Sequence, residues 1–222
     1  MIIVENIEVF GWKAALRGMR NAMNSWNKAD TTYFEDGGIE IGENDMKLCK
    51  SLVKAGSDHG KFLRMIHMQC DITGPLYWWK EFDTYKVGTV ANSCSTMHKI
   101  HAEEFTDDDF SHEHLNQTGS VCLDMVKNLL NSARNKYNET GDKKYWWQMI
   151  QLLPSSYNQK RTVDLNYEVL KHIYHAREGH RLDEWDTFRC WCDTLPYFKE
   201  LCVEPLEKHT CTCGGNCHCN EK

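Results

Sequence analysis

An apolar segment between two glycines, followed at once by a proline, restricts the fold of this chain more than any other feature. Residues 62–72 are rich in apolar side chains, with Gly60 and Gly74 on either side. A segment of this length with such flanks favours a strand. Pro75 then suits the first turn of a helix, where its missing N–H would have no acceptor. The residues that follow are heavily aromatic, so the chain must accommodate a strand that leads directly into an aromatic helix.

The rest of the chain is mainly helical in pattern. A second strand is expected at residues 2–10, and the polar residues 27–42, which contain Gly37 and Gly38, indicate a connection or a hairpin. Residues 87–97 are rich in hydroxyls and amides and are expected to form a loop. Apolar periodicity and end signals predict helices over residues 11–26, 45–55, 75–86, 113–137, 143–153, 164–177 and 182–202. The predicted class is therefore α/β or α+β, with one modest sheet packed by helices.

Composition excludes several classes of protein. The chain has 222 residues, of which 41% are hydrophobic, and its formal net charge is 26 − 32 = −6. This composition is globular, and the mild acidity disfavours binding to long nucleic acids, which requires a basic surface. No run of about 18 apolar residues occurs, so no membrane span is expected. The first residues show no signal-peptide pattern, and we expect a cytoplasmic protein with reduced thiols.

The 11 cysteines fall into two groups. Seven are dispersed through residues 1–205, for which we expect one domain, and four crowd into a tail at residues 206–222. The four are arranged as two Cys-x-Cys pairs around a Gly-Gly-Asn turn, namely Cys211, Cys213, Cys217 and Cys219. Four thiolates this close together suit one Zn²⁺ or a soft ion such as Cu(I). A reduced tail that binds no metal is an equally good interpretation.

Residues 164–177 place a polar side chain at each end of an apolar stripe. Asn166, Leu170, Ile173 and Arg177 follow one another at intervals of 4, 3 and 4 positions, which is the spacing of one helix face. An amide at one end and a guanidinium at the other could line a pocket. On spacing alone, a core stripe whose polar ends reach solvent is the favoured alternative.

Three cations lie in or before segments that could meet at a phosphate. Lys86 precedes the hydroxyl-rich residues 87–97, and Lys160 and Arg161 precede the stripe. Cations supply charge and hydroxyls supply directed donors, so together they would suit a phosphate group. The alternative is that all three are solvated loop charges.

Two segments carry an ordered set of motifs. Residues 55–100 run from a glycine- and histidine-containing turn through a strand and a proline-started helix to a serine-terminated signature. In residues 153–188 the ordered positions are Leu153-Pro154, Lys160, Asn166, Arg177 and Trp185. In order and spacing, the two segments resemble the central and C-terminal blocks of flavin-dependent thymidylate synthases, and they cover most of residues 44–202.

This resemblance implies a fold, an assembly and a reaction. The fold has a modest, mostly antiparallel sheet packed by helices, and the assembly is a homotetramer with active sites between subunits. The cofactor is FAD, which NADPH reduces, and methylenetetrahydrofolate donates the one-carbon unit. The reaction converts dUMP to dTMP, so the resemblance implies an enzyme whose partner is a pyrimidine nucleotide.

The same resemblance assigns roles to individual residues. Arg177 matches an arginine that contacts the uracil ring and stabilises negative charge on it. Ser95 matches the serine that closes the signature beside the dUMP phosphate, and we assign it with Arg177 to catalysis. Positions assigned to the nucleotide are Lys160, Arg161, Glu81, Ser93, Ser95 and Arg177, and positions assigned to the cofactor are Asn166, Lys86 and Asn92.

The chain departs from the family pattern at the signature. The family's Arg-His-Arg falls on Thr84, Tyr85 and Lys86, and its glutamate appears as Ser93. Each missing charge-assisted hydrogen bond is worth about 1.5–3 kcal/mol. Three hypotheses follow: an active synthase in which other cations compensate, an enzyme for a different pyrimidine nucleotide, and an inactive relative with a structural or interaction role.

Overall fold

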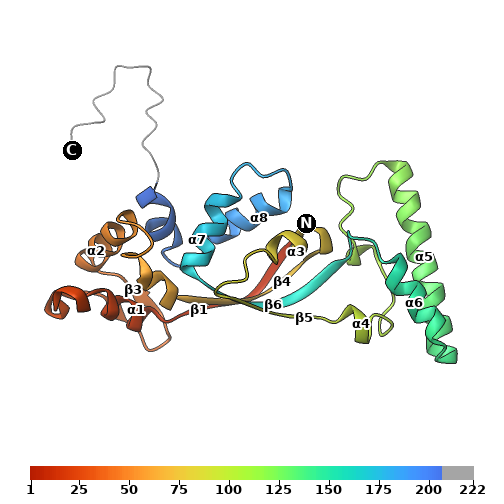
Figure 1. Cartoon of the computed structure of the whole chain (residues 1–222), viewed down its shortest axis with the longest axis horizontal. Coiled ribbons are helices and arrows are strands. Elements are labelled where there is room, and N and C mark those ends of the chain that lie inside the picture. The colour runs from red at the N-terminus through yellow and green to blue at the C-terminus, as the bar shows by residue number, and fades with distance from the viewer. Residues whose placement is uncertain (207–222) are drawn as a thin grey trace, which may run out of the picture.

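The computed structural model describes residues 1–206, and a four-stranded antiparallel sheet lies at its centre (Figure 1). The strands are β1 (Ile3–Phe10), β4 (His67–Pro75), β5 (Thr89–Ser93) and β6 (Asn158–Asn166), in the order β1-β4-β6-β5. The predicted class, a small antiparallel sheet packed by helices, is confirmed. The predicted metal ligands Cys211, Cys213, Cys217 and Cys219 lie outside the described residues.

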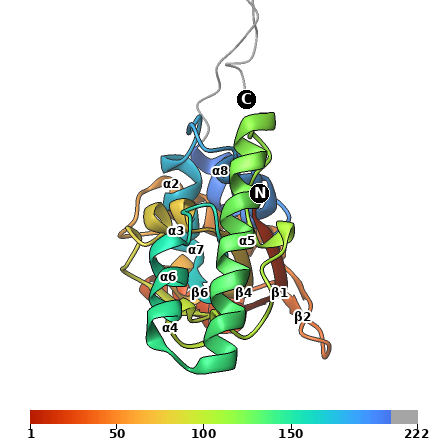
Figure 2. The same ribbon diagram turned by 90° about the vertical axis from the view of Figure 1, so that its right-hand side faces the viewer.

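Helices cover one face of the sheet, and further helices lie beyond both of its ends. The face is covered by α3 (Leu76–Phe82), α7 (Tyr167–Ala176) and α8 (Asp183–Cys192). One end carries α1 (Trp12–Met19), α2 (Glu43–Lys54) and a hairpin of β2 (Thr32–Tyr33) and β3 (Ile39–Glu40). The other end carries α4 (Thr96–Lys99), α5 (Gln117–Thr140) and α6 (Lys143–Leu152), and Figure 2 shows α5 beside α6.

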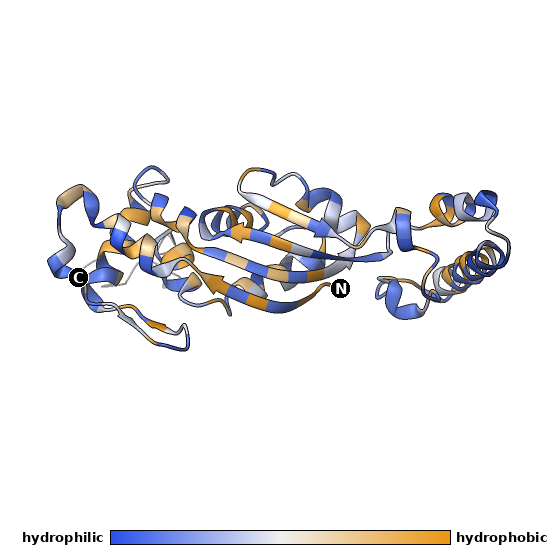
Figure 3. Ribbon diagram, turned by 90° about the horizontal axis from the view of Figure 1, so that it is seen from below, coloured by the Kyte–Doolittle hydropathy of each residue, from blue (hydrophilic) through white to orange (hydrophobic). Residues whose placement is uncertain are grey.

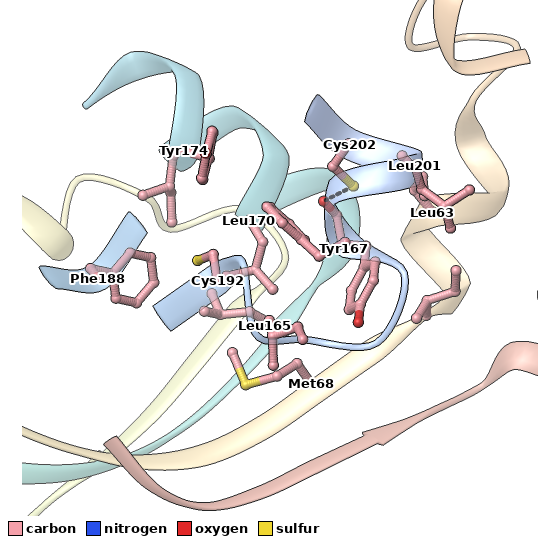
Figure 4. Packing of buried hydrophobic residues seen from close by; sticks show 14 of the residues in the cluster. Leu63, Met68, Leu165, Tyr167, Leu170, Tyr174, Phe188, Cys192, Leu201 and Cys202 are labelled. Atoms are coloured by element: carbon pink, nitrogen blue, oxygen red, sulfur yellow. Dashed lines mark hydrogen bonds between the residues drawn. The ribbon is translucent and has the colours of Figure 1, made fainter. Parts of the chain in front are cut away.

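The main core lies between the two central strands and the covering helices. Successive side chains of a strand point to opposite faces, so Met68 of β4 and Leu165 of β6 lie side by side beneath the helices, in the same cluster as Phe188 of α8 (Figure 4). Trp78 and Trp79 of α3 are fully buried in the same cluster. The strand predicted at residues 62–72 begins later, at His67, because residues 61–65 form a 3₁₀ turn.

The opposite face of the sheet carries the alternate, polar side chains. Asp71 of β4 faces Thr162 of β6 there and accepts its hydroxyl hydrogen bond, at 2.5 Å. In Figure 3 the strands cross the view with hydrophilic and hydrophobic bands in alternation. Among the described residues, no helix covers this face.

The helix α5 belongs to a smaller, separate core. Its buried residues Leu130 and Ala133 pack with Met149 of α6. Four residues with core-like spacing are instead 45–60% exposed, namely Leu115, Val121, Met125 and Leu129. Apolar residues at this spacing usually form a buried helix face, but in the single chain they stay exposed because α5 packs mainly against α6. Although α5 has 24 residues, no helix in residues 1–206 combines the length and apolarity needed to cross a bilayer.

Three predicted elements are wrong. Residues 164–166 end the strand β6 rather than begin a helix, and residues 89–93 form β5 rather than a loop. Both strands are rich in polar residues, so their hydrogen bonds to distant partner strands decide their conformation, not an apolar run. The helix predicted at residues 182–202 ends at Cys192, and a separate turn follows at Lys199–Val203, after Pro196.

Candidate functional site

Arg177 is the centre of a polar cluster at the C-terminal end of α7. Its Nη1 donates to Oε2 of Glu81 at 2.8 Å, and its Nε donates to the hydroxyl of Tyr85 at 2.7 Å. The guanidinium also lies 4.5 Å from the ring centre of Trp185, a cation–π contact. Only 15% of the Arg177 side chain is exposed. The structure therefore brings Arg177 and Glu81 together, although 96 positions separate them.

Glu81 is shared among several donors. Its Oε2 also accepts the indole N–H of Trp185 at 2.9 Å, and Nε2 of His180 lies 3.2 Å away. One carboxylate on α3 thus orients an arginine at the end of α7, a tryptophan of α8 and a histidine in the turn between these two helices. The sequence assigned no role to Tyr85 or His180. The one signal that could have identified them is their position in the turns that follow α3 and α7.

Asn166 caps α7 and does not lie on its face. Its Oδ1 accepts the backbone N–H of Val169 at 3.0 Å, which is the usual role of an asparagine at a helix start. Gly88 approaches its amide so closely that a Cβ there would lie 2.9 Å from Nδ2. Leu170 and Ile173 are fully buried in the core, so the core interpretation of the predicted stripe is correct for these two residues.

Lys160 and Arg161 lie on opposite faces of the sheet because they are consecutive in β6. Arg161 faces the helices: its Nη1 donates to Asp83 at 2.7 Å, and its guanidinium lies 4.2 Å from the ring centre of Trp79. Lys160 faces the uncovered side and donates to Glu5 at 3.2 Å. This hydrogen bond raises the pKa of Lys160. The expected pairing of the two cations beside one ligand does not occur within the chain.

A pocket of about 370 Å³ opens between the end of α3 and the start of β5. Asp83 and Tyr85 line it, so it lies between the partners of Arg161 and Arg177. Lys86 and Thr89 line it as well. The hydroxyl oxygen of Thr89 is buried and has no hydrogen-bond partner among the described residues. The pocket thus offers the cation of Lys86, with an unpaired hydroxyl buried in its wall.

Three predicted residues lie farther along β5. Asn92 pairs with Thr162 and faces the uncovered side, and Ser93 ends the strand opposite Arg161. Ser95 caps α4, with its Oγ accepting the backbone N–H groups of Met97 and His98 at 3.2 and 3.1 Å. Ser95 therefore lies beyond the end of β5 and does not line the pocket. Among the described residues, no hydrogen bond joins Ser95 to Arg177, Glu81 or Tyr85.

Metal binding, and thiol chemistry at Cys49 or Cys70, find no support in the described part of the chain. No three of its histidine, cysteine and acidic side chains are placed to hold a metal ion. Burial raises the pKa of the thiols of Cys49 and Cys70 to about 12, which keeps both protonated at neutral pH. These thiols are core residues, not nucleophiles.

The fold is shared with solved structures of nucleotide-modifying enzymes. Thymidylate synthase X from Helicobacter pylori, in a crystal structure with FAD and dUMP, superposes with a TM-score of 0.68 at 17% identity, covering 94% of this chain and 100% of that one. A second structure of the same flavin-dependent enzyme, also complexed with FAD and dUMP, gives 0.65 at 18% identity over 92% and 99%. The chain thus has the fold of the flavin-dependent thymidylate synthases.

A further structure extends the comparison to a related chemistry. The UMP/dUMP methylase PolB from Streptomyces cacaoi, bound with 5-Br dUMP, has a TM-score of 0.55 at 14% identity, covering 78% of this chain and 76% of that one. No family model and no curated protein matches the sequence. The similarity is therefore one of fold, at identities of 14–18%.

Proposed function

We propose that this protein is a cytoplasmic pyrimidine-nucleotide methylase that converts dUMP to dTMP with methylenetetrahydrofolate and NADPH. The observation that carries the proposal is the placement of Arg177, held by Glu81 and Tyr85 next to a pocket of nucleotide scale. Three structures with this fold contain dUMP or 5-Br dUMP. The pocket volume of about 370 Å³ falls within the range of about 300–1,000 Å³ usual for small-molecule sites.

The residues divide into a group for the base and a group for the phosphate. Arg177 would contact the pyrimidine ring and stabilise negative charge that develops on it. Glu81 and Tyr85 hold its guanidinium in one orientation before the ligand arrives. Lys86 and the unpaired hydroxyl of Thr89 would bind the phosphate, because both line the pocket and Lys86 has no carboxylate partner among residues 1–206.

The described residues of one chain do not fit a complete FAD site. A flavin dinucleotide carries a diphosphate, but Arg161 is already paired with Asp83 and Arg177 with Glu81. The amide of Asn166 is buried against Gly88. We therefore propose that FAD binds only where a second copy supplies further cations. The bound flavin would supply the redox chemistry of the methylation.

A homotetramer would resolve the separation of the assigned residues. Ser93 and Ser95 lie at the far end of β5, and Asn92 and Lys160 face the uncovered side of the sheet. In an oligomer these groups would contact the ligand of a neighbouring copy. The exposed apolar residues of α5 supply a surface for such contacts. Met125→Glu should reduce the molar mass measured by light scattering, whereas Ser120→Glu on the same helix should leave it unchanged.

A second candidate is a nucleotide-binding protein without synthase activity. The specific observation that favours it is the pairing of both site arginines with carboxylates, Arg161 with Asp83 and Arg177 with Glu81. A neutralised guanidinium stabilises developing charge less well than an unpaired one. In this case the protein would bind dUMP, dCMP or dTMP but would not form dTMP from dUMP.

Two measurements separate the candidates. The absorbance spectrum of the purified protein reports bound flavin directly, and an assay of dUMP-dependent NADPH oxidation with detection of dTMP reports turnover. The proposal expects both signals, with turnover abolished by Arg177→Ala. Arg189→Ala is a matched control, because Arg189 also stacks on an aromatic ring, at 4.6 Å from Tyr174, but lies outside the pocket. A colourless protein that neither binds added FAD nor turns over would refute the synthase and leave the second candidate.

A further inference from the structure

A second cavity lies at the end of the molecule formed by α1, α2 and the hairpin. It has a volume of about 240 Å³ and is lined by α1, by the segment from Trp26 to Tyr33 and by Asp45 of α2. None of its lining residues belongs to the candidate nucleotide site. An inference about this cavity therefore does not depend on the proposed function.

A buried ion pair forms part of the cavity wall. Arg20 is 3% exposed and Asp45 is 1% exposed, and Nε of Arg20 donates to Oδ1 of Asp45 at 2.7 Å. The other oxygen of Asp45 accepts the backbone N–H groups of Asp30 and Thr31 and the hydroxyl of Thr31. Both carboxylate oxygens of Asp45 therefore already accept hydrogen bonds within the protein.

Arg20, in contrast, has an unused donor. Its Nη1 donates to the carbonyl oxygen of Ser25 at 3.3 Å, but Nη2 is buried and has no partner among the described residues. A buried guanidinium nitrogen without an acceptor is unfavourable. Arg20 lines the cavity, so a small movement of its side chain would let this nitrogen donate to an acceptor bound there and remove this cost.

The cavity also carries an excess of positive charge. Lys13 and Arg17 line it together with Arg20, whereas Asp45 is its one lining carboxylate. Neither Lys13 nor Arg17 forms an ion pair within residues 1–206. Three cations against one carboxylate favour an anion, and a guanidinium binds carboxylate or phosphate by directed hydrogen bonds.

Two aromatic rings define the rest of the ligand. Trp26 is 50% exposed and Tyr33 is 41% exposed, and both line the cavity. Half-exposed aromatic faces suit stacking on a flat, apolar body. A volume of about 240 Å³ is below the range of about 300–1,000 Å³ that drug-sized ligands occupy, so the ligand is small.

We propose that this cavity binds a small organic anion, a carboxylate or phosphate on a flat apolar body. The anionic group accepts a hydrogen bond from Nη2 of Arg20 and lies near Lys13 and Arg17, and the flat body lies against Trp26 and Tyr33.

The test uses the full chain and isothermal titration calorimetry with four probes. Benzoate and phenyl phosphate carry both parts of the ligand, benzamide lacks the charge, and inorganic phosphate lacks the flat body. The proposal expects benzoate or phenyl phosphate to bind at least tenfold more tightly than benzamide and inorganic phosphate. Equal binding of benzamide, or no binding of either anion, would overturn it.

Two variants locate the binding in this cavity without disturbing its buried pair. Arg17 and Trp26 are exposed, so Arg17→Gln and Trp26→Ala should fold normally. Each should weaken binding of the better anion about five- to tenfold. Lys28→Gln is the matched control, because it removes one exposed cation that does not line the cavity. Unchanged affinity in Arg17→Gln, or an equal loss in Lys28→Gln, would place the anion elsewhere and refute the assignment.

Discussion

The contact between Arg177 and Glu81 can be tested as a coupled pair. Arg177→Ala removes a charge-assisted hydrogen bond to Glu81, a hydrogen bond to Tyr85 and the stacking on Trp185. The bond to Glu81 counts at the low end of about 1.5–3 kcal/mol, because 35% of the Glu81 side chain is exposed to screening solvent. With about 1 kcal/mol for each of the other two contacts, the free energy of unfolding should fall by about 3.5 kcal/mol.

Glu81→Gln should lower the free energy of unfolding less than Arg177→Ala does, and it should strengthen the binding of the nucleotide. The amide oxygen can still accept one hydrogen bond, so the free energy of unfolding should fall by about 1 kcal/mol. The guanidinium of Arg177 is no longer neutralised, so it should attract the nucleotide more strongly. We expect an increase in dUMP affinity of about tenfold, equivalent to about 1.4 kcal/mol.

The assay is a double-mutant cycle followed by urea denaturation and by calorimetric titration with dUMP. The wild-type chain, the two single variants and the double variant should give a coupling energy of about 1 kcal/mol in unfolding. Arg189→Ala should lower stability without changing dUMP affinity, because it lies in α8 outside the pocket. A coupling energy near zero, together with unchanged dUMP affinity in Glu81→Gln, would refute the view that Glu81 binds and neutralises the guanidinium of Arg177.

Three further predictions concern folding and reactivity. Gly42→Ala should lower the free energy of unfolding by about 2 kcal/mol or more in urea titrations, because a Cβ there would overlap Asp30; an unchanged midpoint would contradict this. The backbone N–H of Asn44 lowers the pKa of Asp30. The stabilising contribution of Asp30 is therefore fully present above pH 3.8, the ordinary pKa of this carboxyl group, and is lost as the pH falls through the lowered pKa. Asp30→Asn should flatten the acid limb of a plot of unfolding free energy against pH. Iodoacetamide at pH 8 should alkylate the exposed Cys94 but not Cys70, whose pKa burial raises to about 12; mass spectrometry that finds modified Cys70 in the folded protein would oppose this assignment.

Local chemistry made much of the fold predictable. Gly11 and Gly141 stand at helix ends with positive φ, and Pro75 stands immediately before α3. Such signals depend on one or two neighbouring residues, so the helices around them could be predicted without knowledge of distant contacts. The N-terminal strand and the hairpin region were also predicted correctly.

The candidate site was predictable only in part. Arg177 and Glu81 could each be selected as functional residues, but their direct contact joins elements that are 96 positions apart. Lys160 and Arg161 were selected together, yet they point to opposite faces once residues 158–166 form a strand. Both residues were expected in the segment before the helix over residues 164–177, where no strand and hence no alternation of faces was predicted.

The sequence by itself determined the mixed class, the helices with clear end signals and the set of polar residues from which a site could be built. These follow from propensities and caps that act over a few residues. Only the tertiary structure decided that the polar segments 89–93 and 158–166 are strands, that the apolar stripe of α5 is exposed, and that Glu81 pairs with Arg177. The physical reason is that strand pairing, burial and ion pairing each depend on partners supplied by distant parts of the chain.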